Sequence, residues 1–288
     1  MQYSTFAAID IGSYDVILEI FEISKKQGIR SVDKICHRME LGKDTYTLGK
    51  IRPEMEEELC RVLADFVRIM EGYRVDDYRA TASSAISEAS NSLYVLGKIH
   101  QLTGFSVTVL SNSEQRFLSY KALAAMEDNF NKIIEKGTAI LDLDGGSFQI
   151  SLFDKDALVT TQNIRMGSLR IRERLAGIQS ETEHYEEMVE ELIWNEVSSF
   201  KKMYLKDRKI ENIMLIGDVF TDSVYQNIEE KTTKIISREN FNTWYEKIIR
   251  QSPMELAVKL GIPLENASLM YPSAVIYKCL IDMMGAEH

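Results

Sequence analysis

Two segments of the chain, 5–20 and 138–153, share one local pattern, and this repeat restricts the fold more than any other feature of the sequence. The first reads TFAAIDIGSYDVILEI and the second reads TAILDLDGGSFQISLF. Each contains an apolar run with an aspartate near its end, a turn with glycine and serine, and a second run of strand-like residues. We therefore predict two β-hairpins that form a structural duplication, with one copy in each of two domains.

The length supports this division, because 288 residues are about twice the usual size of one domain. Strands and helices are expected to alternate around each hairpin, which predicts two α/β domains that face each other across a cleft. The polar stretch 127–137 is the predicted boundary. The domains are then expected over 1–126 and 127–273, and the final helix, 274–288, is considered able to pack back on the first domain.

The remaining elements are predicted from hydrophobic periodicity. In the first half we expect strands over 29–41, 78–82 and 105–110, with helices from Pro53, over 84–102 and over 113–126. In the second half we expect strands over 157–164 and 213–216, with helices over 180–205, 241–250, 254–260 and 274–284.

Composition limits the location and the partners. The chain carries 34 basic and 44 acidic residues, a net charge of −10, which argues against nucleic acid as a partner. Cys36, Cys60 and Cys279 form no disulfide or zinc pattern, so we expect a reducing, cytoplasmic location. No stretch approaches the roughly 18 apolar residues of a membrane span, and the first residues lack the pattern of a secretion signal. We therefore expect neither membrane insertion nor secretion.

The glycine turns of the two hairpins indicate a phosphate site. Backbone N–H groups in such a turn can point at an anion without an intervening side chain, and a serine hydroxyl adds a donor. The candidate phosphate-binding residues are Gly12 and Ser13 in the first hairpin and Gly145, Gly146 and Ser147 in the second. A single turn of this kind is also common in ordinary hairpins, whereas two copies in matching contexts favour a pair of phosphate clamps.

Asp10 and Asp142 occupy equivalent positions near the end of the first strand of each hairpin. Carboxylates at these positions suit a Mg²⁺ ion that keeps several waters and bridges to phosphate oxygens. We therefore predict Mg²⁺ as the cofactor, with Asp10 and Asp142 as its ligands, and a phosphate-containing small molecule or short polyphosphate as the bound molecule.

The paired AIDIGS and LDLDGGS hairpins resemble the phosphate loops of the actin, hexokinase and heat-shock ATPase superfamily. Within it, the chain resembles the exopolyphosphatase / guanosine pentaphosphate phosphatase (Ppx/GppA) family over almost its whole length. The most specific segments are SNSEQRFLSY over 111–120 and MGSLRIRERL over 166–175. The resemblance implies two ribonuclease H-like domains of the actin-like ATPase type. It also implies hydrolysis of terminal phosphoanhydride bonds, with polyphosphate or a phosphorylated guanine nucleotide as substrate.

Glu114 is the catalytic residue that the resemblance implies. In the family, a glutamate in the segment matching SNSEQRFLSY positions and deprotonates the water that attacks the terminal phosphate. A carboxylate base suits this reaction, which needs an in-line water and charge stabilisation. Glu114 also follows Ser111 by three positions, so a capping box at the start of a helix explains it as well. Both interpretations are open.

Several residues depart from the family pattern, and they fall at the proposed site. They are Tyr14 and Asp15 in the first loop, Asp144 and Gln149 in the second, Ser87 in place of an arginine, Asp218, Val219 and Phe220 in a later glycine-rich loop, and Ser268 in place of an aspartate before the final helix. Losing an arginine while gaining two carboxylates opposes the binding of an anion, and glutamine cannot act as a base.

Two functions therefore remain. One is a Mg²⁺-dependent exopolyphosphatase-like hydrolase with Glu114 as base, and the other is a catalytically degenerate relative that senses a phosphate ligand or binds another protein. Because the substitutions fall at the site, we expect exopolyphosphatase activity to be low or absent. The preferred phosphate compound is left open, and so is the oligomeric state, a homodimer included.

Overall fold

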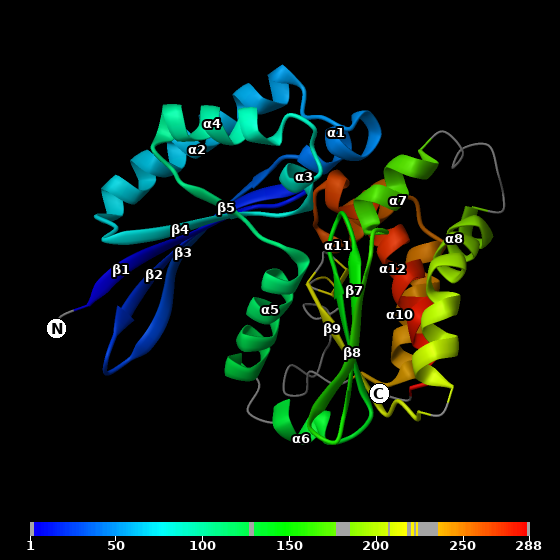
Figure 1. Ribbon diagram of the computed structural model, residues 1–288. Helices are drawn as coiled ribbons and strands as arrows, with labels where there is room; N and C mark the ends of the chain where they lie inside the picture. The colour runs from blue at the N-terminus through cyan, green and yellow to red at the C-terminus, as the bar shows by residue number, and fades with distance from the viewer. Residues whose placement is uncertain are drawn as a thin grey trace. The chain divides into compact units, whose positions relative to one another are not determined.

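Two sheets organise the chain (Figure 1). The computed structural model describes residues 3–126, 130–176, 185–206, 208–217, 220–221, 223 and 236–286. The chain divides into two compact units, Met1–Phe117 and Leu118–His288, so the division lies inside helix α5 (Asn112–Met126), whereas the expected boundary followed this helix. The two α/β units confirm the predicted fold class.

The sheet of the first unit has five strands in the order β3-β2-β1-β4-β5. In chain order these are β1 (Ser4–Ile11), β2 (Asp15–Ser24), β3 (Gly28–Arg38), β4 (Asp77–Ala82) and β5 (Val107–Val109). The first three form an antiparallel meander, and the last two continue the sheet in parallel with β1. Parallel neighbours need crossover connections, which helices usually provide.

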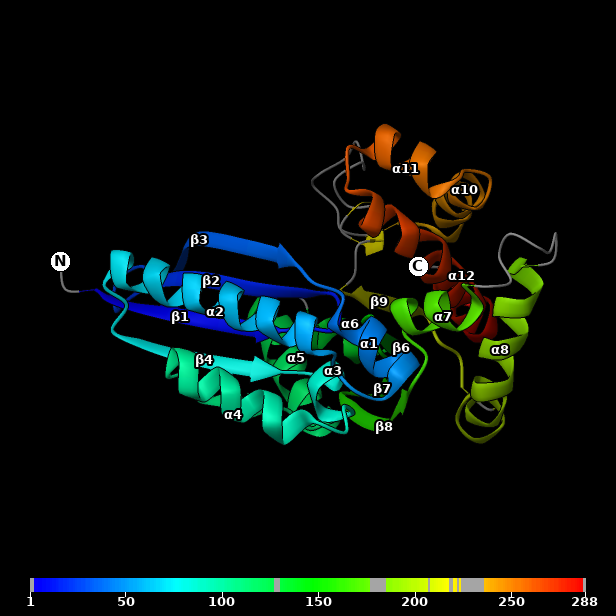
Figure 2. The same ribbon diagram turned by 90° about the horizontal axis from the view of Figure 1, so that it is seen from above.

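The crossover helices of the first unit cover one face of this sheet. They are α2 (Pro53–Tyr73) and α4 (Ser92–Thr103), which lie side by side in Figures 1 and 2. On α2, Leu59, Leu63 and Phe66 recur at helical spacing and are buried in one core with Ile9 and Ile11 of β1. The amphipathic pattern that predicted this helix is therefore also what attaches it to the sheet.

The second unit repeats the same plan with four strands in the order β8-β7-β6-β9. They are β6 (Thr138–Leu143), β7 (Phe148–Asp154), β8 (Ala157–Ile164) and β9 (Asn212–Ile216). Again three strands form an antiparallel meander and the next strand lies parallel to the first. This agreement confirms the predicted structural duplication.

Helix α12 (Leu264–Met284) is the central helix of the second unit. It contacts α7 (Ser168–Leu175), α8 (Tyr185–Phe200), α10 (Arg238–Ile249) and α11 (Pro253–Leu260). Residues on every side of α12 itself are buried, as is expected of a helix that is enclosed by other helices. A separate apolar cluster lies elsewhere on the sheet of the second unit. There, α6 (Phe130–Ile134) and the end of α5 pack on Ile140 and Phe153.

Helix α12 begins at Leu264, and the expectation that the final helix begins at Ala274 is wrong. Proline lacks a backbone N–H and usually ends or kinks a helix, and Pro272 lies inside this one. Pro272 is itself buried between the buried residues Met270 and Ala274. Core packing on both sides of the proline therefore outweighs the lost hydrogen bond.

The helix expected over 84–102 is in fact two helices, α3 (Ser84–Ser87) and α4. Between them, the Asn91 side chain accepts a hydrogen bond from Ile51 N at 3.0 Å and donates one to Ile51 O at 2.8 Å. Asparagine side chains that bond to backbone groups compete with helix formation, which explains the break.

Two other regions differ from the prediction. A helix that the sequence pattern did not predict, α1 (Leu41–Leu48), follows β3 and ends at Gly49, whose φ of 71° is left-handed. The helix expected over 180–205 is α8 followed by a π-helical turn, Lys201–Leu205, and residues 180–184 lie outside the described residues.

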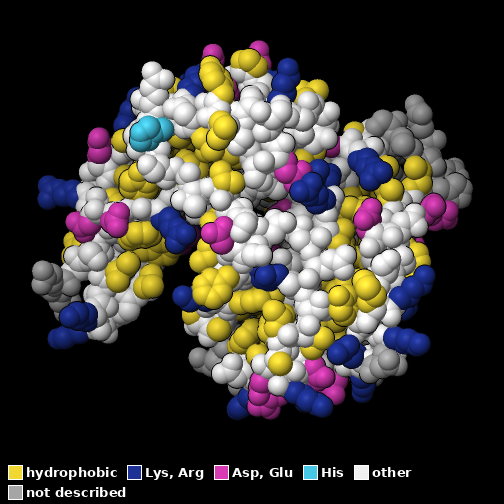
Figure 3. All heavy atoms as spheres, in the orientation of Figure 1, with side chains coloured by type: hydrophobic (Ala, Val, Ile, Leu, Met, Phe, Trp, Pro, Cys, Tyr) yellow, Lys and Arg dark blue, Asp and Glu magenta, His cyan; other side chains and the backbone are white. Residues whose placement is uncertain are grey.

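On the face shown in Figure 3, the Lys and Arg side chains of the described residues are interspersed with Asp, Glu and apolar side chains. Among the described helices, none combines the length and the apolar character that crossing a membrane requires.

Phe220, which stands where the family pattern has a glycine, provides a test of the core of the second unit. Its side chain is 1% exposed, and its ring centroid lies 5.3 Å from that of Tyr277 and 5.9 Å from that of Phe241. We predict that Phe220→Ala lowers the free energy of unfolding by about 3–5 kcal/mol in urea titrations. The control Leu93→Ala, at a side chain 87% exposed, should stay within about 0.5 kcal/mol. Equal effects of the two substitutions would contradict this packing.

Candidate functional site

The turn between β1 and β2 is fixed to the residues that lead into α1. Gly42 N donates a hydrogen bond to Ser13 O at 2.6 Å, and Met39 N donates one to Tyr14 O at 3.1 Å. These bonds join the turn to a segment that follows the whole meander in the chain. The position of the first glycine turn therefore depends on α1, the helix that the sequence pattern did not predict.

The hydroxyl of Ser13 belongs to a cluster of three hydroxyl groups. Ser13 Oγ lies 2.7 Å from Tyr46 Oη and 3.2 Å from Ser84 Oγ, and the last two are 2.9 Å apart. Tyr46 lies on α1 and Ser84 begins α3, so the cluster ties the turn to two helices. Ser13 is buried and bonded within its own unit, and its role as a phosphate donor stays a prediction.

Asp15 lies over the first glycine turn. A Cβ atom on Gly12 would lie 3.0 Å from Asp15 O and 3.1 Å from Asp15 Oδ1, a tight contact that glycine avoids. Burial raises the pKa of Asp15, and Arg38, whose Nη1 lies 3.5 Å from Asp15 Oδ2, opposes the rise. The Arg38 guanidinium also lies 3.9 Å from the centroid of the Tyr14 ring. One arginine thus accommodates both substituted residues of this loop.

Asp10 lies at the exposed end of β1, as predicted. In the sheet it pairs with Ile17 of β2 and Thr81 of β4, and Thr81 Oγ1 donates a hydrogen bond to Asp10 Oδ1 at 3.4 Å. The first unit thus presents a carboxylate beside its glycine turn.

Glu114 forms the capping box that the sequence indicated. Its Oε2 accepts hydrogen bonds from Ser111 N at 2.9 Å and Ser111 Oγ at 2.7 Å, and Glu114 N donates to Ser111 Oγ at 3.3 Å. The two bonds from Ser111, with a smaller contribution from Arg79, lower the pKa of Glu114. The capping interpretation is confirmed, and the exposed carboxylate is ionised at neutral pH, as a general base must be.

The second glycine turn, residues 144–147, is closed by its own aspartate. Asp144 Oδ1 accepts hydrogen bonds from Gly146 N at 2.5 Å and Ser147 N at 2.8 Å. Asp144 N also donates to Ser147 O at 3.0 Å. Ser147 is nearly buried, and its Oγ accepts a hydrogen bond from Asn163 Nδ2 at 3.2 Å. The three residues of this turn that were predicted to bind phosphate thus lie together, and the N–H groups of two of them, Gly146 and Ser147, point at the Asp144 carboxylate.

This turn packs tightly on the beginning of α7. Ser168 N donates to Asp144 O at 3.1 Å and Arg170 N donates to Gly145 O at 2.9 Å. Arg170 Nε adds a bond to Gly146 O at 2.8 Å. A Cβ atom on Gly167 would lie 2.3 Å from Asp144 O, which leaves room only for glycine. The segment 166–175 of the resemblance is therefore the support of the turn.

Asp142 is the most strongly perturbed carboxylate of the site. Burial raises its pKa from the ordinary value of 3.8 to about 6, and the nearby charge of Asp144 adds to the rise. Ser119 Oγ donates a hydrogen bond to Asp142 Oδ2 at 3.1 Å, which opposes it. Gln149, which is 7% exposed, is its partner across the β6–β7 ladder. A glutamate at position 149 would therefore add charge directly beside Asp142.

The donor chemistry of the second unit fits Mg²⁺. Asp142 supplies a carboxylate beside the hydroxyl of Ser119 and the carboxylate of Asp144, and oxygen ligands of this kind are those that Mg²⁺ prefers. Within the described part of the chain, no three His, Cys, Asp or Glu residues gather into a cation site. The ion would accordingly keep several waters, and its binding to Asp10 and Asp142 stays a prediction.

The other substituted positions have structural roles. Ser87 ends α3 and donates a hydrogen bond to Ser84 O at 3.5 Å. Ser268 lies within α12, so the expectation that it precedes the final helix is wrong, and it accepts a hydrogen bond from Arg172 Nη1 at 2.8 Å. Asp218 and Val219 lie outside the described residues.

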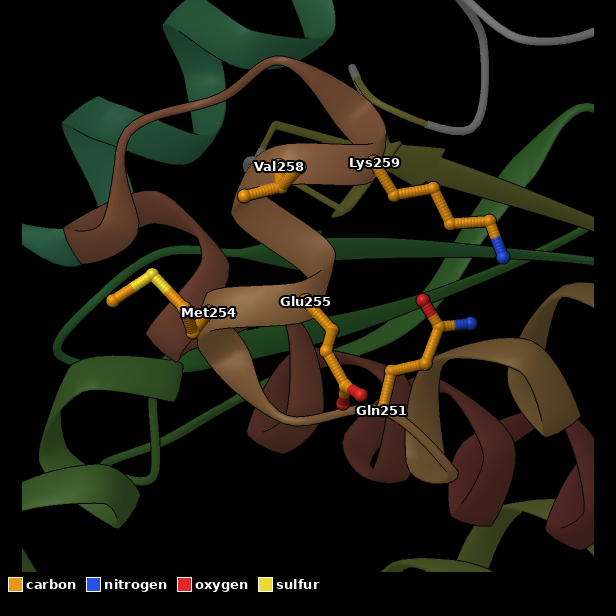
Figure 4. Close-up of a pocket in the computed structure, with 5 residues that line it drawn as sticks. All are labelled: Gln251, Met254, Glu255, Val258 and Lys259. Atoms are coloured by element: carbon orange, nitrogen blue, oxygen red, sulfur yellow. The ribbon is translucent and has the colours of Figure 1, made fainter.

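A shallow pocket on α11 is a separate surface feature (Figure 4). It is lined by Gln251, Met254, Glu255, Val258 and Lys259. The Glu255 carboxylate caps its own helix, with Ser252 N and Ser252 Oγ each 2.8 Å from Oε2. The lining combines the apolar Met254 and Val258 with polar and charged side chains and contains no glycine turn, so we do not assign phosphate to it.

Known proteins resemble this chain in sequence. A sequence model of the Ppx/GppA phosphatase family matches residues 19–288. The bifunctional 3-dehydroquinate synthase/phosphatase of Fusobacterium nucleatum is 22% identical over 308 residues, which cover 98% of this chain and 44% of that protein. Exopolyphosphatase 1 of Mycobacterium leprae is 25% identical over 144 residues, which cover 50% of this chain and 41% of that protein. The chain thus spans less than half the length of either relative.

Solved structures share the fold. An exopolyphosphatase from Cytophaga hutchinsonii superposes with a TM-score of 0.84 at 18% identity, over 97% of this chain and 91% of that one. The Ppx/GppA family member of Aquifex aeolicus superposes with a TM-score of 0.76 at 18% identity, over 99% and 92% of the two chains. These likenesses confirm the fold class that the resemblance implied.

Gly167→Ala tests the support of the second turn. The added methyl group would collide with backbone atoms of Asp144 and Gly145, which cannot move aside as a flexible side chain can. We predict a loss of about 1–3 kcal/mol in the free energy of unfolding. Gly97→Ala is the matched control, because no atom lies within 4 Å of a Cβ on Gly97 in α4. This control should gain roughly 0.5–1 kcal/mol, and a neutral Gly167→Ala would show that the turn is not packed as described.

The raised pKa of Asp142 predicts a pH-dependent stability. The ionised carboxylate destabilises the folded state above about pH 6, and this cost disappears as the pH falls towards the ordinary value of 3.8. Asp142→Asn should therefore stabilise the protein at pH 8 more than at pH 4.5, by about 1–2 kcal/mol, measured by urea unfolding. The full shift corresponds to about 3 kcal/mol relative to a pH well below 3.8, of which the unfolded state already shows part at pH 4.5, and partial contact with solvent reduces it further.

The pKa of Asp142 itself provides the check, by carboxyl NMR titration. Asp144→Asn removes the neighbouring negative charge and should lower it, whereas Ser119→Ala removes a hydrogen bond to the ionised form and should raise it. Shifts in the same direction for the two variants would be inconsistent with the stated causes.

Proposed function

Because the chain belongs to the Ppx/GppA phosphatase family, we propose that it binds polyphosphate or a phosphorylated guanine nucleotide with Mg²⁺ and hydrolyses its terminal phosphoanhydride bond slowly. The observation that carries the proposal is the duplicated hairpin, which presents a glycine turn and an aspartate in each unit. Turns of this kind supply backbone donors for phosphate oxygens. The segment that holds Glu114 adds an ionised carboxylate.

The assigned roles follow from the contacts of each residue. Both bonds from Ser111 go to Glu114 Oε2 and hold the carboxylate at the start of α5, so Oε1 is the oxygen that would accept the proton of the attacking water. Asp10 and Asp142 would hold Mg²⁺, which when bound neutralises charge on the phosphate oxygens. Arg170 supports the second turn through Gly146 O.

Slow turnover follows from what the site lacks. Gln149 cannot act as a second carboxylate, and Ser87 is bonded within α3 where the family has an arginine. If each missing group costs roughly 10²-fold, turnover falls by about four orders of magnitude. The alternative, a degenerate relative that senses a phosphate ligand or binds a protein partner, is favoured by the Asp144 carboxylate, which already holds the turn donors.

Phosphate release from long-chain polyphosphate tests the proposal. We predict slow Mg²⁺-dependent release that Glu114→Gln lowers by at least about 100-fold, because the general base is lost. Gln149→Glu should raise it, and only with Mg²⁺, because the new carboxylate lies beside Asp142.

The chain offers a matched control for the structural role of Glu114. Ser252 and Glu255 form a capping box with nearly identical distances on α11. Glu255→Gln should therefore cost the same stability as Glu114→Gln without changing turnover. Equal losses of turnover in the two variants, or full activity of Glu114→Gln, would overturn the catalytic assignment.

A further inference from the structure

The second glycine turn carries an anion of its own. Asp144 Oδ1 lies 2.5 Å from Gly146 N and 2.8 Å from Ser147 N, so one carboxylate oxygen accepts both hydrogen bonds. Hydrogen bonds from backbone N–H groups to a carboxylate are among the stronger ones in proteins. A phosphate oxygen would need these same donors, because successive N–H groups of a turn form its anion-binding concavity.

The backbone of the turn is fixed and cannot move to present other N–H groups to a ligand. Its carbonyl groups at Asp144, Gly145 and Gly146 are all held by Ser168 N, Arg170 N and Arg170 Nε. The close approach at Gly167 excludes even a methyl group between the turn and α7. The backbone is therefore preorganised, and the side chain of Asp144 is the part that must leave if a ligand is to reach Gly146 N and Ser147 N.

We propose that Asp144 is a specificity-determining residue, whose carboxylate holds the place of a phosphate oxygen in the second turn and must be displaced by the ligand. This inference rests on the proposed function in taking the turn as the ligand site. Orthophosphate offers too little binding energy to displace the carboxylate. A chain phosphate such as tripolyphosphate, bound with Mg²⁺, has additional phosphate groups whose contacts supply the energy to displace the carboxylate. The class of ligand selected is accordingly a chain phosphate.

The first turn provides an internal comparison. Asp15 also lies against a turn glycine, but there Gly12 N donates to the backbone oxygen of Asp15 at 2.9 Å. Removing the Asp15 charge leaves that bond in place, whereas removing the Asp144 side chain releases two N–H groups. Asp15→Asn is therefore a control for a general effect of charge.

The test is calorimetric titration of the full chain with tripolyphosphate and Mg²⁺, and separately with orthophosphate. Asp144→Ala should bind tripolyphosphate at least tenfold more tightly than the natural protein and should gain measurable affinity for orthophosphate. Asp144→Asn keeps an oxygen acceptor without the charge and should gain less than Asp144→Ala. Asp15→Asn should change the affinity less than threefold. Asp144→Gly, the residue of the family pattern, serves as the second variant if Asp144→Ala does not fold.

A second readout needs no ligand. In amide NMR spectra without phosphate, the signals of Gly146 and Ser147 should lose protection from hydrogen exchange in Asp144→Ala and keep it in Asp15→Asn. Unchanged protection would overturn the inference. So would equal gains in affinity for Asp144→Ala, Asp144→Asn and Asp15→Asn, which would indicate a general charge effect.

The outcomes separate this inference from the proposed function. If the natural protein binds tripolyphosphate and Asp144→Ala binds it no better, the inference falls and the proposed function stands. If only Asp144→Ala binds, the inference stands and the proposed function of the natural protein falls. If neither binds, both fall.

Discussion

The backbone contact between the 144–147 turn and the beginning of α7 is the constraint on which the second half of the candidate site depends. Gly167 permits an approach that any side chain would prevent, and Ser168 and Arg170 then bond to the turn carbonyls. The turn is thereby fixed in a conformation whose N–H groups converge on one point, where the Asp144 oxygen lies. The same fixed geometry keeps Asp144 close enough to Asp142 to raise the pKa of that carboxylate.

Each unit fixes the glycine turn of its hairpin with different contacts. In both, a β-meander ends its first strand in an aspartate and a glycine turn. The first turn is held by α1 and by the hydroxyl cluster of Ser13, Tyr46 and Ser84, whereas the second is held by α7. Both turns have gained an acidic residue relative to the family pattern. Arg38 faces the one in the first turn, and the turn N–H groups bond the one in the second. The second turn thus retains the scaffold of a phosphate clamp while the Asp144 carboxylate occupies its donors.

Local patterns predicted the hairpins, the strands parallel to them and helix α2, because hydrophobic periodicity and turn residues act over short distances along the chain. They did not predict the roles of Ser13 or Asp144, which depend on partners set by the tertiary fold and by the turn geometry. The predicted start of α12 was wrong because the burial of residues around Pro272 outweighs the tendency of proline to break a helix. The facing of Asp10 and Asp142 across a cleft, the Mg²⁺ ion, the homodimer and the cytoplasmic location stay predictions.

The proposed function depends on phosphate binding at the glycine turns, with the Asp144 carboxylate displaced from the second turn. A crystal structure of the chain grown with Mg²⁺ and a non-hydrolysable chain phosphate tests it most directly. We expect a phosphate group of the ligand at the 144–147 turn, with the Asp144 side chain turned away from Gly146 N and Ser147 N. A ligand bound away from both turns, or at one turn with Asp144 still bonded to the same N–H groups, would contradict it.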